Sequence, residues 1–295
     1  MELLNPYHKV GRAFKGNLHT HVKNPVTTCG DWPAEDAIRI YEELGYDFVA
    51  ITNHDVFTDA RGLSENSFLV IGGQEVHLES AFDGLDYHVL ALGINRTIPR
   101  GDSPQVLVDE IRSAGGVPML CHPRWSSIPA PALRPIENVS LLEIYNHSGA
   151  ARQVTHSIEE WDALLGFSRR PFWGTAVDDT HHYPEDAANG WVMVFAEELT
   201  EKSLLEAISS GAFYSTQGPR FEEISISEQG LLKVRFADGY DIRFIGAGGA
   251  VLGDTVGGMH LAARHQITGQ EGYIRIEVSD REGRTAWTNP IFVKP

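Results

Sequence analysis

Histidines are the residues in this sequence whose number and spacing suggest chemistry. The 295 residues include 13 histidines, and eleven of them lie before residue 183. Histidine is the most common metal ligand in proteins, and its neutral imidazole binds dications such as zinc. His19 and His21 are separated by one residue, and this spacing of two places both side chains on the same face of an extended segment. This pair could share one metal ion or bind two adjacent ones.

Further residues of the ligand type stand at or near the ends of short apolar segments. They are His54, Glu75, His88, His122, Asp178, Asp179 and His181. His88 opens its apolar segment, whereas the others follow theirs. In parallel α/β folds, binding sites are built at the carboxyl ends of the strands. We therefore expect these side chains to converge on a common metal site.

The elements that position these residues alternate over the first two thirds of the chain. Short apolar segments predict strands at 48–51, 68–71, 89–92, 117–120, 141–144 and 172–177. Amphipathic segments predict helices at 34–44, 104–114, 157–165 and 200–210, the last with Thr200 as N-cap. This alternation predicts βα units and an α/β fold with a largely parallel sheet, either open or closed into a barrel.

The pattern changes near Gly218-Pro219, because no amphipathic helix is indicated after residue 222. Strands are predicted at 224–226, 231–236, 242–245, 261–267, 273–278 and 284–293. We therefore expect two domains: residues 10–218 carry the candidate site, and residues 219–295 form a small antiparallel β-sandwich.

Composition restricts the partners. The 40 acidic and 24 basic side chains give a net charge of −16, which argues against a protein that coats nucleic acid or binds membranes through a basic surface. No segment approaches the roughly 18 apolar residues of a membrane span, and no secretory signal is evident. Two cysteines, Cys29 and Cys121, are too few for a disulfide framework. We expect a cytoplasmic protein with an anionic small-molecule substrate, and its oligomeric state is not indicated.

Taken in order, these motifs resemble the PHP superfamily, named after polymerase and histidinol phosphatase. The matching segments are His19-Thr20-His21, Ile51-Thr52-Asn53-His54-Asp55, Glu75, His88, His122-Pro123 and Asp179-Thr180-His181, within roughly residues 14 to 215. The resemblance implies a distorted (β/α)7 barrel that binds two or three divalent metal ions (manganese, zinc or iron) at its carboxyl-terminal end. Residues 286–291 are similar to the ending of two-domain members related to carbaryl-type hydrolases.

The sequence departs from the family pattern at one ligand. Members usually carry Ser-Asp-Gly after the His-x-His motif, and alignment without a gap places Thr28-Cys29-Gly30 there. Either Cys29 is a thiolate ligand, or Asp31 takes the position after a small shift, or the ligand is missing. A thiolate favours zinc or ferrous iron over magnesium.

Other neighbours of the motifs are assigned by the same resemblance. The Asp-x-His spacing of the family selects Asp179 as the ligand and leaves Asp178 as a supporting neighbour. Three further histidines are expected outside the metal site, namely His77, His147 and His182.

The resemblance and the ligand set predict a multinuclear metal-dependent hydrolase. The expected reaction is that of a phosphoesterase, in which a hydroxide bridging two metals attacks a phosphate mono- or diester. Arg124, two residues after His122, is expected to bind a substrate phosphate or carboxylate through its forked guanidinium, unless it forms a surface ion pair. Asn146 is a further candidate for substrate contact.

Two alternative functions stay open. The same hydroxide could hydrolyse carboxyl esters, carbamates or amides. The departure at Cys29 motivates the second alternative, a non-catalytic binding module with a degenerate metal site.

Overall fold

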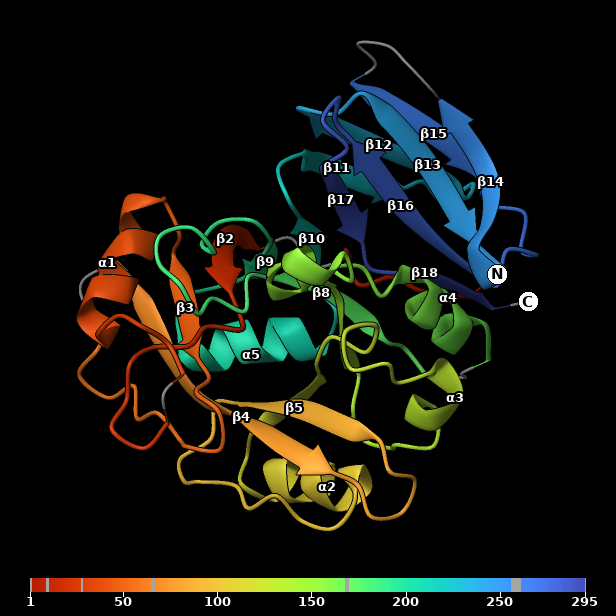
Figure 1. Cartoon of the computed structure of the whole chain (residues 1–295). Coiled ribbons are helices and arrows are strands. Elements are labelled where there is room, and N and C mark those ends of the chain that lie inside the picture. Colours follow the sequence, from red (N-terminus) through yellow and green to blue (C-terminus); the bar gives the residue numbers. More distant parts are fainter. Residues whose placement is uncertain are drawn as a thin grey trace.

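A computed structural model describes residues 2–8, 11–27, 29–64, 67–167, 170–255 and 261–294. Val10 and Pro295, the outer ends of the two predicted domains, lie outside the described residues, as does Thr28 of the departing motif. Residues up to about 217 are a mixed α/β structure with helices around a sheet, and the described residues after them, called the last third below, form strands and one short 3₁₀ helix (Figure 1). The predicted boundary near residue 218 stays a prediction.

Seven strands of the first part are hydrogen-bonded side by side in chain order. They are β2 (Arg12–Asn17), β3 (Phe48–Ile51), β4 (Leu69–Glu79), β5 (Asp86–Leu92), β6 (Val117–Leu120), β7 (Leu141–Asn146) and β8 (Trp173–Val177). Two strands that the sequence patterns did not predict, β9 (Trp191–Ala196) and β10 (Phe213–Thr216), extend the sheet from the other side of β2.

The sheet is less parallel than the alternation predicts. β2–β3, β3–β4, β6–β7 and β7–β8 are parallel pairs, but β4–β5 and β5–β6 are antiparallel. The reason is the short connection of residues 80–85 between β4 and β5, because a parallel pair needs a crossover of a dozen or more residues. Consequently the beginning of β5, which carries His88, lies at the edge where β4 and β6 approach the site.

The four predicted helices are present, and their observed ends differ from the predicted ones by two residues at most. They are α1 (Ala34–Glu43), α2 (Pro104–Ser113), α4 (Ile158–Phe167) and α5 (Glu201–Ser209), joined by the single turn α3 (Ala130–Leu133) and the 3₁₀ helix η1 (His147–Arg152). The Thr200 hydroxyl accepts a hydrogen bond from Ser203 N and caps α5 as predicted. None of the described helices combines the length and the apolar character needed to cross a membrane.

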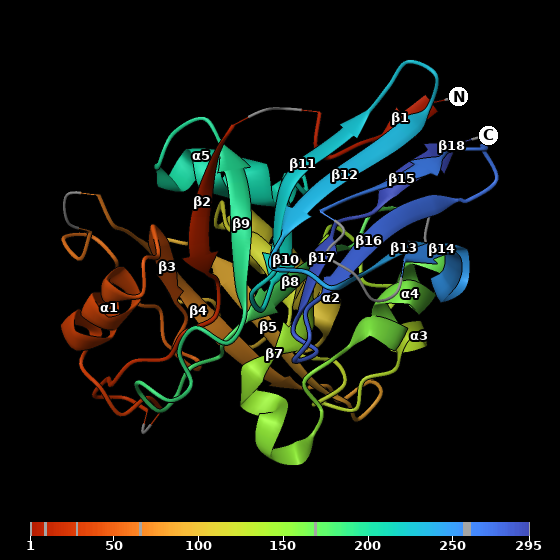
Figure 2. The ribbon, with the colours of Figure 1, turned by 90° about the horizontal axis from the view of Figure 1, so that it is seen from above.

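The last third forms two facing sheets (Figure 2). One contains β11 (Arg220–Ile226), β12 (Leu231–Ala237) and β15 (Ala262–Gln266). The other contains β13 (Asp241–Gly246), β14 (Ala250–Thr255), β16 (Tyr273–Ser279), β17 (Thr285–Thr288), β18 (Ile291–Lys294) and the N-terminal β1 (Glu2–Leu4), with the short 3₁₀ helix η2 (Ala247–Gly249) between β13 and β14. Phe236 of the first sheet and Ile276 of the second share one apolar cluster. As predicted, the described residues after 222 contain no α-helix.

Two features join the last third to the first. β17 pairs with β10, so the sheet continues from one part into the other. The buried guanidinium of Arg275 in β16 forms a two-pronged hydrogen bond with Asp162 of α4, at 2.8 and 2.7 Å. The predicted strand 284–293 is divided into β17 and β18 around Pro290, which has no N–H to donate to a ladder.

Side-chain hydrogen bonds connect β8 to β10. The Ser215 hydroxyl of β10 donates to Gly174 O at 2.7 Å and accepts from Ala176 N at 2.9 Å. Asn289, between β17 and β18, accepts from Gly174 N at 2.8 Å and donates to Phe213 O at 3.1 Å. A residue from the last third therefore holds β8 next to β10.

We predict that Asn289→Ala lowers the free energy of unfolding by about 1–3 kcal/mol, because the buried N–H of Gly174 in β8 loses the side-chain oxygen that accepts its hydrogen bond. The measurement is the urea midpoint, with Asn95→Ala, a change at an exposed asparagine, as the control. Equal midpoints for the two variants would contradict the role of Asn289.

Candidate metal centre

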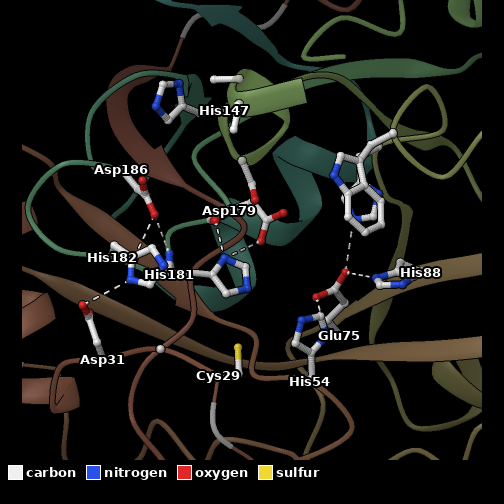
Figure 3. A pocket seen from close by; sticks show the side chains of 16 residues that line it. Cys29, Asp31, His54, Glu75, His88, His147, Asp179, His181, His182 and Asp186 are labelled. Atoms are coloured by element: carbon white, nitrogen blue, oxygen red, sulfur yellow. Dashed lines mark hydrogen bonds and ion pairs between the residues drawn. The ribbon is translucent and has the colours of Figure 1, made fainter. Parts of the chain in front are cut away.

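The ends of the strands bring six histidines and two carboxylates into one cluster. Both carboxylates and four of the histidines line a pocket of about 760 Å³, part of which is shown in Figure 3, and the other two histidines, His19 and His21, are fully buried beside them. Each of these residues lies on, or directly after, one of six strands. They are His19 and His21 after β2, His54 after β3, Glu75 in β4, His88 in β5, His122 after β6, and Asp179 and His181 after β8. The predicted convergence is therefore present.

Backbone pairing continues beyond the strands and keeps these segments in register. Thr20 bridges to Thr180 in parallel orientation, and His54 bridges to Glu75 in the same way. The chain also turns sharply at two of the site residues, because His122 and Asp179 have φ angles of 25° and 53°. Positive φ is uncommon for residues other than glycine, and such backbone strain clusters at functional sites.

Glu75 is fully buried at the centre of the cluster. Five imidazole nitrogens lie within 3.3 Å of its carboxylate oxygens. Oε1 is 2.6 Å from His88 Nδ1 and 3.3 Å from His122 Nε2. Oε2 is 2.9 Å from His54 Nδ1 and 3.2 Å from both His19 Nε2 and His21 Nε2. Burial raises the pKa of Glu75, but these histidines more than offset it and hold the pKa well below its usual value. Glu75 is therefore ionised.

Four donor atoms lie around one point between β2, β4 and β8. Asp179 Oδ1 is 3.2 Å from His19 Nε2 and 3.0 Å from His21 Nε2, and these two nitrogens are 3.0 Å apart. Glu75 Oε2 is the fourth atom. Ligand atoms bound at about 2.0–2.2 Å to one dication lie roughly 3.0–3.6 Å from one another. The observed spacing fits a single metal ion.

Hydrogen bonding supports this fit. Glu75 Oε2 and Asp179 Oδ1 are buried, and within the described chain no hydrogen bond reaches either oxygen. Buried carboxylate oxygens usually have partners, so such atoms need an explanation. Ligand atoms that point to a common cation, and not at each other, have this arrangement.

Two further groups of donors adjoin the first. One contains His54, Glu75 and His88, and the other contains His21, Cys29, His54 and His181. Within each group the donor atoms lie within 4.8 Å of one another. These His, Glu, Asp and Cys groups are suited to divalent metal ions.

Protons and metal ions compete for these histidines. Burial lowers the pKa of His19, but Asp179, Glu75 and Glu143 more than offset it, so that the pKa is well above the usual value. The same opposition raises the pKa of His54 to about 9, mainly through Glu75. In the metal-free protein, protonated imidazoles therefore compensate the buried carboxylates near neutral pH.

Glu143 and Asn146 of β7 hold the ligands from outside. Glu143 Oε1 accepts a hydrogen bond from His19 Nδ1 at 2.7 Å, and its Oε2 accepts one from His122 N at 2.9 Å. Asn146 was expected to contact substrate, but its buried Nδ2 donates to Glu143 Oε2 at 2.9 Å and to Asp179 Oδ2 at 3.1 Å. The structure thus gives Asn146 a positioning role.

Asp178 lies away from the donor groups, and the structure does not support it as a metal ligand. Its carboxylate accepts hydrogen bonds from three successive backbone N–H groups, those of Ala188, Asn189 and Gly190. Tyr41 OH donates to it as well, at 2.9 Å. Asp179 is therefore the aspartate that faces the imidazoles, since its Oδ1 lies 3.2 Å from His19 Nε2 and 3.0 Å from His21 Nε2.

The structure brings Cys29 to the cluster and leaves Asp31 outside it. Burial raises the pKa of the Cys29 thiol, but contacts with His181, His21 and His54 more than offset it and lower the pKa to about 4. Asp31 instead lies 3.4 Å from His182 Nδ1 and accepts a hydrogen bond from Tyr183 N. The position reached by alignment without a gap is therefore the one that faces the imidazoles.

Arg124 was expected to bind substrate, and its position contradicts this. Its backbone N–H donates to the Ser157 hydroxyl, which places its side chain against the first turn of α4. There the guanidinium pairs with Glu159 and, at 3.0 Å, with Glu160. Arg124 is absent from the residues that line the pocket. The alternative of a surface ion pair is the one observed.

Sequence reasoning missed several residues of the pocket lining. His147 and His182 were placed outside the metal site, yet both line the pocket, as does Asp186 (Figure 3). Trp125 belongs to the lining as well. His147 directly follows β7, so its place after a strand was an available signal. His77, by contrast, is not among the residues that line the pocket: it pairs with Asp86, and its ring lies 4.9 Å from that of His88.

No protein-family model matches the chain. Its structure is similar to that of a two-domain protein from Bacteroides vulgatus that contains a predicted PHP-like metal-dependent phosphoesterase, with a TM-score of 0.54, 16% identity and 95% of both chains covered. At this identity the likeness establishes the fold, and the chain therefore shares this two-domain fold. The PHP resemblance of the sequence has a structural counterpart.

Two more distant similarities were found. An amidohydrolase from Chromobacterium violaceum, with bound sulfate and no metal, matches 58% of this chain and 89% of its own at 14% identity, but its TM-score of 0.43 supports no inference. An uncharacterised protein of Methanocaldococcus jannaschii is 25% identical over 117 residues, 40% of this chain. The match spans 62% of that relative's length.

We predict that divalent metal ions displace protons when they bind. Because the pKa values of His19 and His54 are raised, metal affinity should increase with pH through neutrality, by about tenfold per pH unit for each proton displaced. Calorimetric titration of the chelator-treated protein in buffers of different ionisation enthalpy measures this release. A pH-independent affinity would contradict the assignment of the donors.

Proposed function

We propose that this protein is a multinuclear metal-dependent hydrolase of the PHP type that cleaves phosphate mono- or diesters. The Glu75-centred cluster carries this proposal, because two buried carboxylates and six imidazoles form adjoining donor groups, and both carboxylates and four of the imidazoles line one pocket. The two-domain fold, shared with a protein containing a predicted PHP-like phosphoesterase, agrees with it.

The proposal includes a PHP-type fold. We infer that residues 10–218 form a distorted (β/α)7 barrel, since β2 to β8 are neighbours in chain order and Ser215 connects β8 to β10. Residues 219–295 would be the β-sandwich domain, supported by the two facing sheets with a common apolar cluster.

Three neighbouring positions could hold two or three ions of manganese, zinc or iron. The residues of the first are His19, His21, Glu75 and Asp179, those of the second His54, Glu75, His88 and His122, and those of the third Cys29, His54 and His181. When bound, the ions would lower the pKa of a water molecule and neutralise the charge that develops on the oxygens of the ester.

Side chains of the protein orient two of the histidines. Glu143 accepts the Nδ1 proton of His19 and so fixes which nitrogen of this ring faces the donors. His147 is oriented by Tyr145 OH, 3.1 Å from its Nδ1, which leaves Nε2 available to a ligand. Burial lowers the pKa of His147 and Asp186 opposes this only in part, so the ring is neutral near pH 7. His147 could therefore hydrogen-bond a substrate without adding charge.

Hydrolysis of carboxyl esters, carbamates or amides is the second candidate, and one observation favours it. The described residues that line the pocket include no Lys or Arg. With Arg124 turned away, positive charge for a phosphate would come from the metal ions alone. A neutral ester does not require positive charge beyond that of the metal ions.

The test is metal analysis followed by a substrate panel. Purified protein should hold at least two divalent ions per chain, and fewer would favour the binding module with a degenerate site. Phosphate mono- and diesters are then compared with carboxyl esters, carbamates and amides in the presence of manganese, zinc or iron. Turnover of the carbonyl substrates alone would replace the first candidate by the second.

We predict that His19→Ala and His122→Ala each lower kcat/KM by more than about 100-fold, beyond the 10- to 100-fold that loss of a supporting contact costs. Circular dichroism should show an intact fold, because the apolar clusters around the sheet remain. Arg124→Ala is the control and should change kcat/KM by less than about threefold, since it removes only a partly exposed ion pair. Near-normal activity of either histidine variant would remove that residue from the site.

We predict that His147→Ala lowers kcat/KM by about 2- to 10-fold, the loss of one neutral hydrogen bond to substrate. The metal content should not change, because His147 acts from the pocket wall. Steady-state kinetics and metal analysis of the same preparation check both parts. Loss of metal would instead identify His147 as a ligand.

A further inference from the structure

We propose that the position formed by Cys29, His54 and His181 is a thiophilic metal site, selective for zinc or another soft dication over manganese and magnesium. The inference rests on the proposed metal centre, but not on its reaction. It assigns one position of the cluster a different metal preference from the carboxylate-rich position beside it.

The geometry brings the sulfur and the imidazoles together. Cys29, His54 and His181, with the neighbouring His21, each offer a donor atom, and these atoms lie within 4.8 Å of one another. In Figure 3 the Cys29 sulfur points into the pocket between His181 and His54. Three segments that are far apart in the sequence thus supply the donors of one position.

His21 keeps the two imidazoles in place. Its ring stacks on His54 with a centroid distance of 4.5 Å and on His181 with one of 4.3 Å. His21 itself is fully buried, so both partner rings pack against a ring that belongs to the protein interior. Its Nδ1 has no hydrogen-bond partner within the described chain, so a buried nitrogen beside the site is still available to a ligand.

The donor set determines the preference. Thiolate and imidazole ligands suit zinc and ferrous iron, whereas magnesium and manganese favour oxygen. The first position has two carboxylate oxygens, Glu75 Oε2 and Asp179 Oδ1, and the third position has sulfur instead. Asp31, which could have supplied oxygen, is held by His182 and Tyr183. The two positions should therefore differ in the metal that they select.

Cys121 is the natural control. It is the other cysteine of the chain, and it lies within reach of Glu75 and His122. Its thiol is buried and donates a hydrogen bond to Met119 O, 3.7 Å away. A neutral thiol is a poor metal ligand.

The experiment is titration of the metal-free full-length protein with cobalt(II), followed by absorption spectroscopy. The wild type and Cys121→Ser should show the near-ultraviolet charge-transfer band of a cobalt thiolate, and Cys29→Ser and Cys29→Asp should not. Zinc should abolish the band at stoichiometric amounts, whereas manganese should not. Cys29→Ser should lower the zinc affinity of one ion by more than about 100-fold, as expected for a direct ligand.

Each other result overturns the proposal in a distinguishable way. If wild-type protein binds at least two cobalt ions without the band, Cys29 is not a ligand, but the metal-dependent hydrolase stands. If the band persists in Cys29→Ser and disappears in Cys121→Ser, the sulfur ligand is Cys121. If manganese removes the band as readily as zinc does, the position is not selective. If no metal binds, the proposed function fails as well.

Discussion

The burial of the Glu75 carboxylate among five imidazoles is the interaction on which the rest of the structure depends. An ionised carboxylate in the interior costs several kcal/mol unless opposite charge and hydrogen bonds compensate it. Compensation here requires β2, β3, β5 and β6 to present their histidines at one edge, around β4. Protons can provide the positive charge in the metal-free protein, and metal ions can provide it in the loaded one.

Two features of the sheet meet this requirement, namely the reversal of β5 and the side-chain hydrogen bonds that hold β8. The short connection between β4 and β5 reverses β5, so that His88 reaches the site from the beginning of its strand. At the other side, Asn289 of the last third hydrogen-bonds to β8 and β10 and holds the strand that leads to Asp179 and His181. Asn289 therefore supports the candidate metal site from a position far along the chain.

The charges of the site explain why bound metal ions would have to supply most of the positive charge that a substrate meets. The described pocket lining offers carboxylates, imidazoles, one thiol and Trp125, but no Lys or Arg. Glu143 and Asn146 form their hydrogen bonds with the candidate ligands and with each other, so these bonds are not directed at a substrate in the pocket. If the proposed function holds, selection between an anionic and a neutral ester would depend on the number and kind of ions, and so on the contrast between the sulfur and carboxylate positions.

The sequence by itself determined which residues stand at strand ends, because hydrophobic periodicity is a local property. Four helices, with ends correct to within two residues, followed from it. The candidate donors from His19 to His181 followed from their positions near strand ends together with the PHP resemblance. Only the tertiary structure decided which way neighbouring side chains turn. Arg124 turns to α4 because Glu159 and Glu160 lie there, and Asp178 turns to the backbone of residues 188–190. Cys29, not Asp31, faces the cluster for the same reason: the direction of a loop side chain depends on partners supplied by distant parts of the chain.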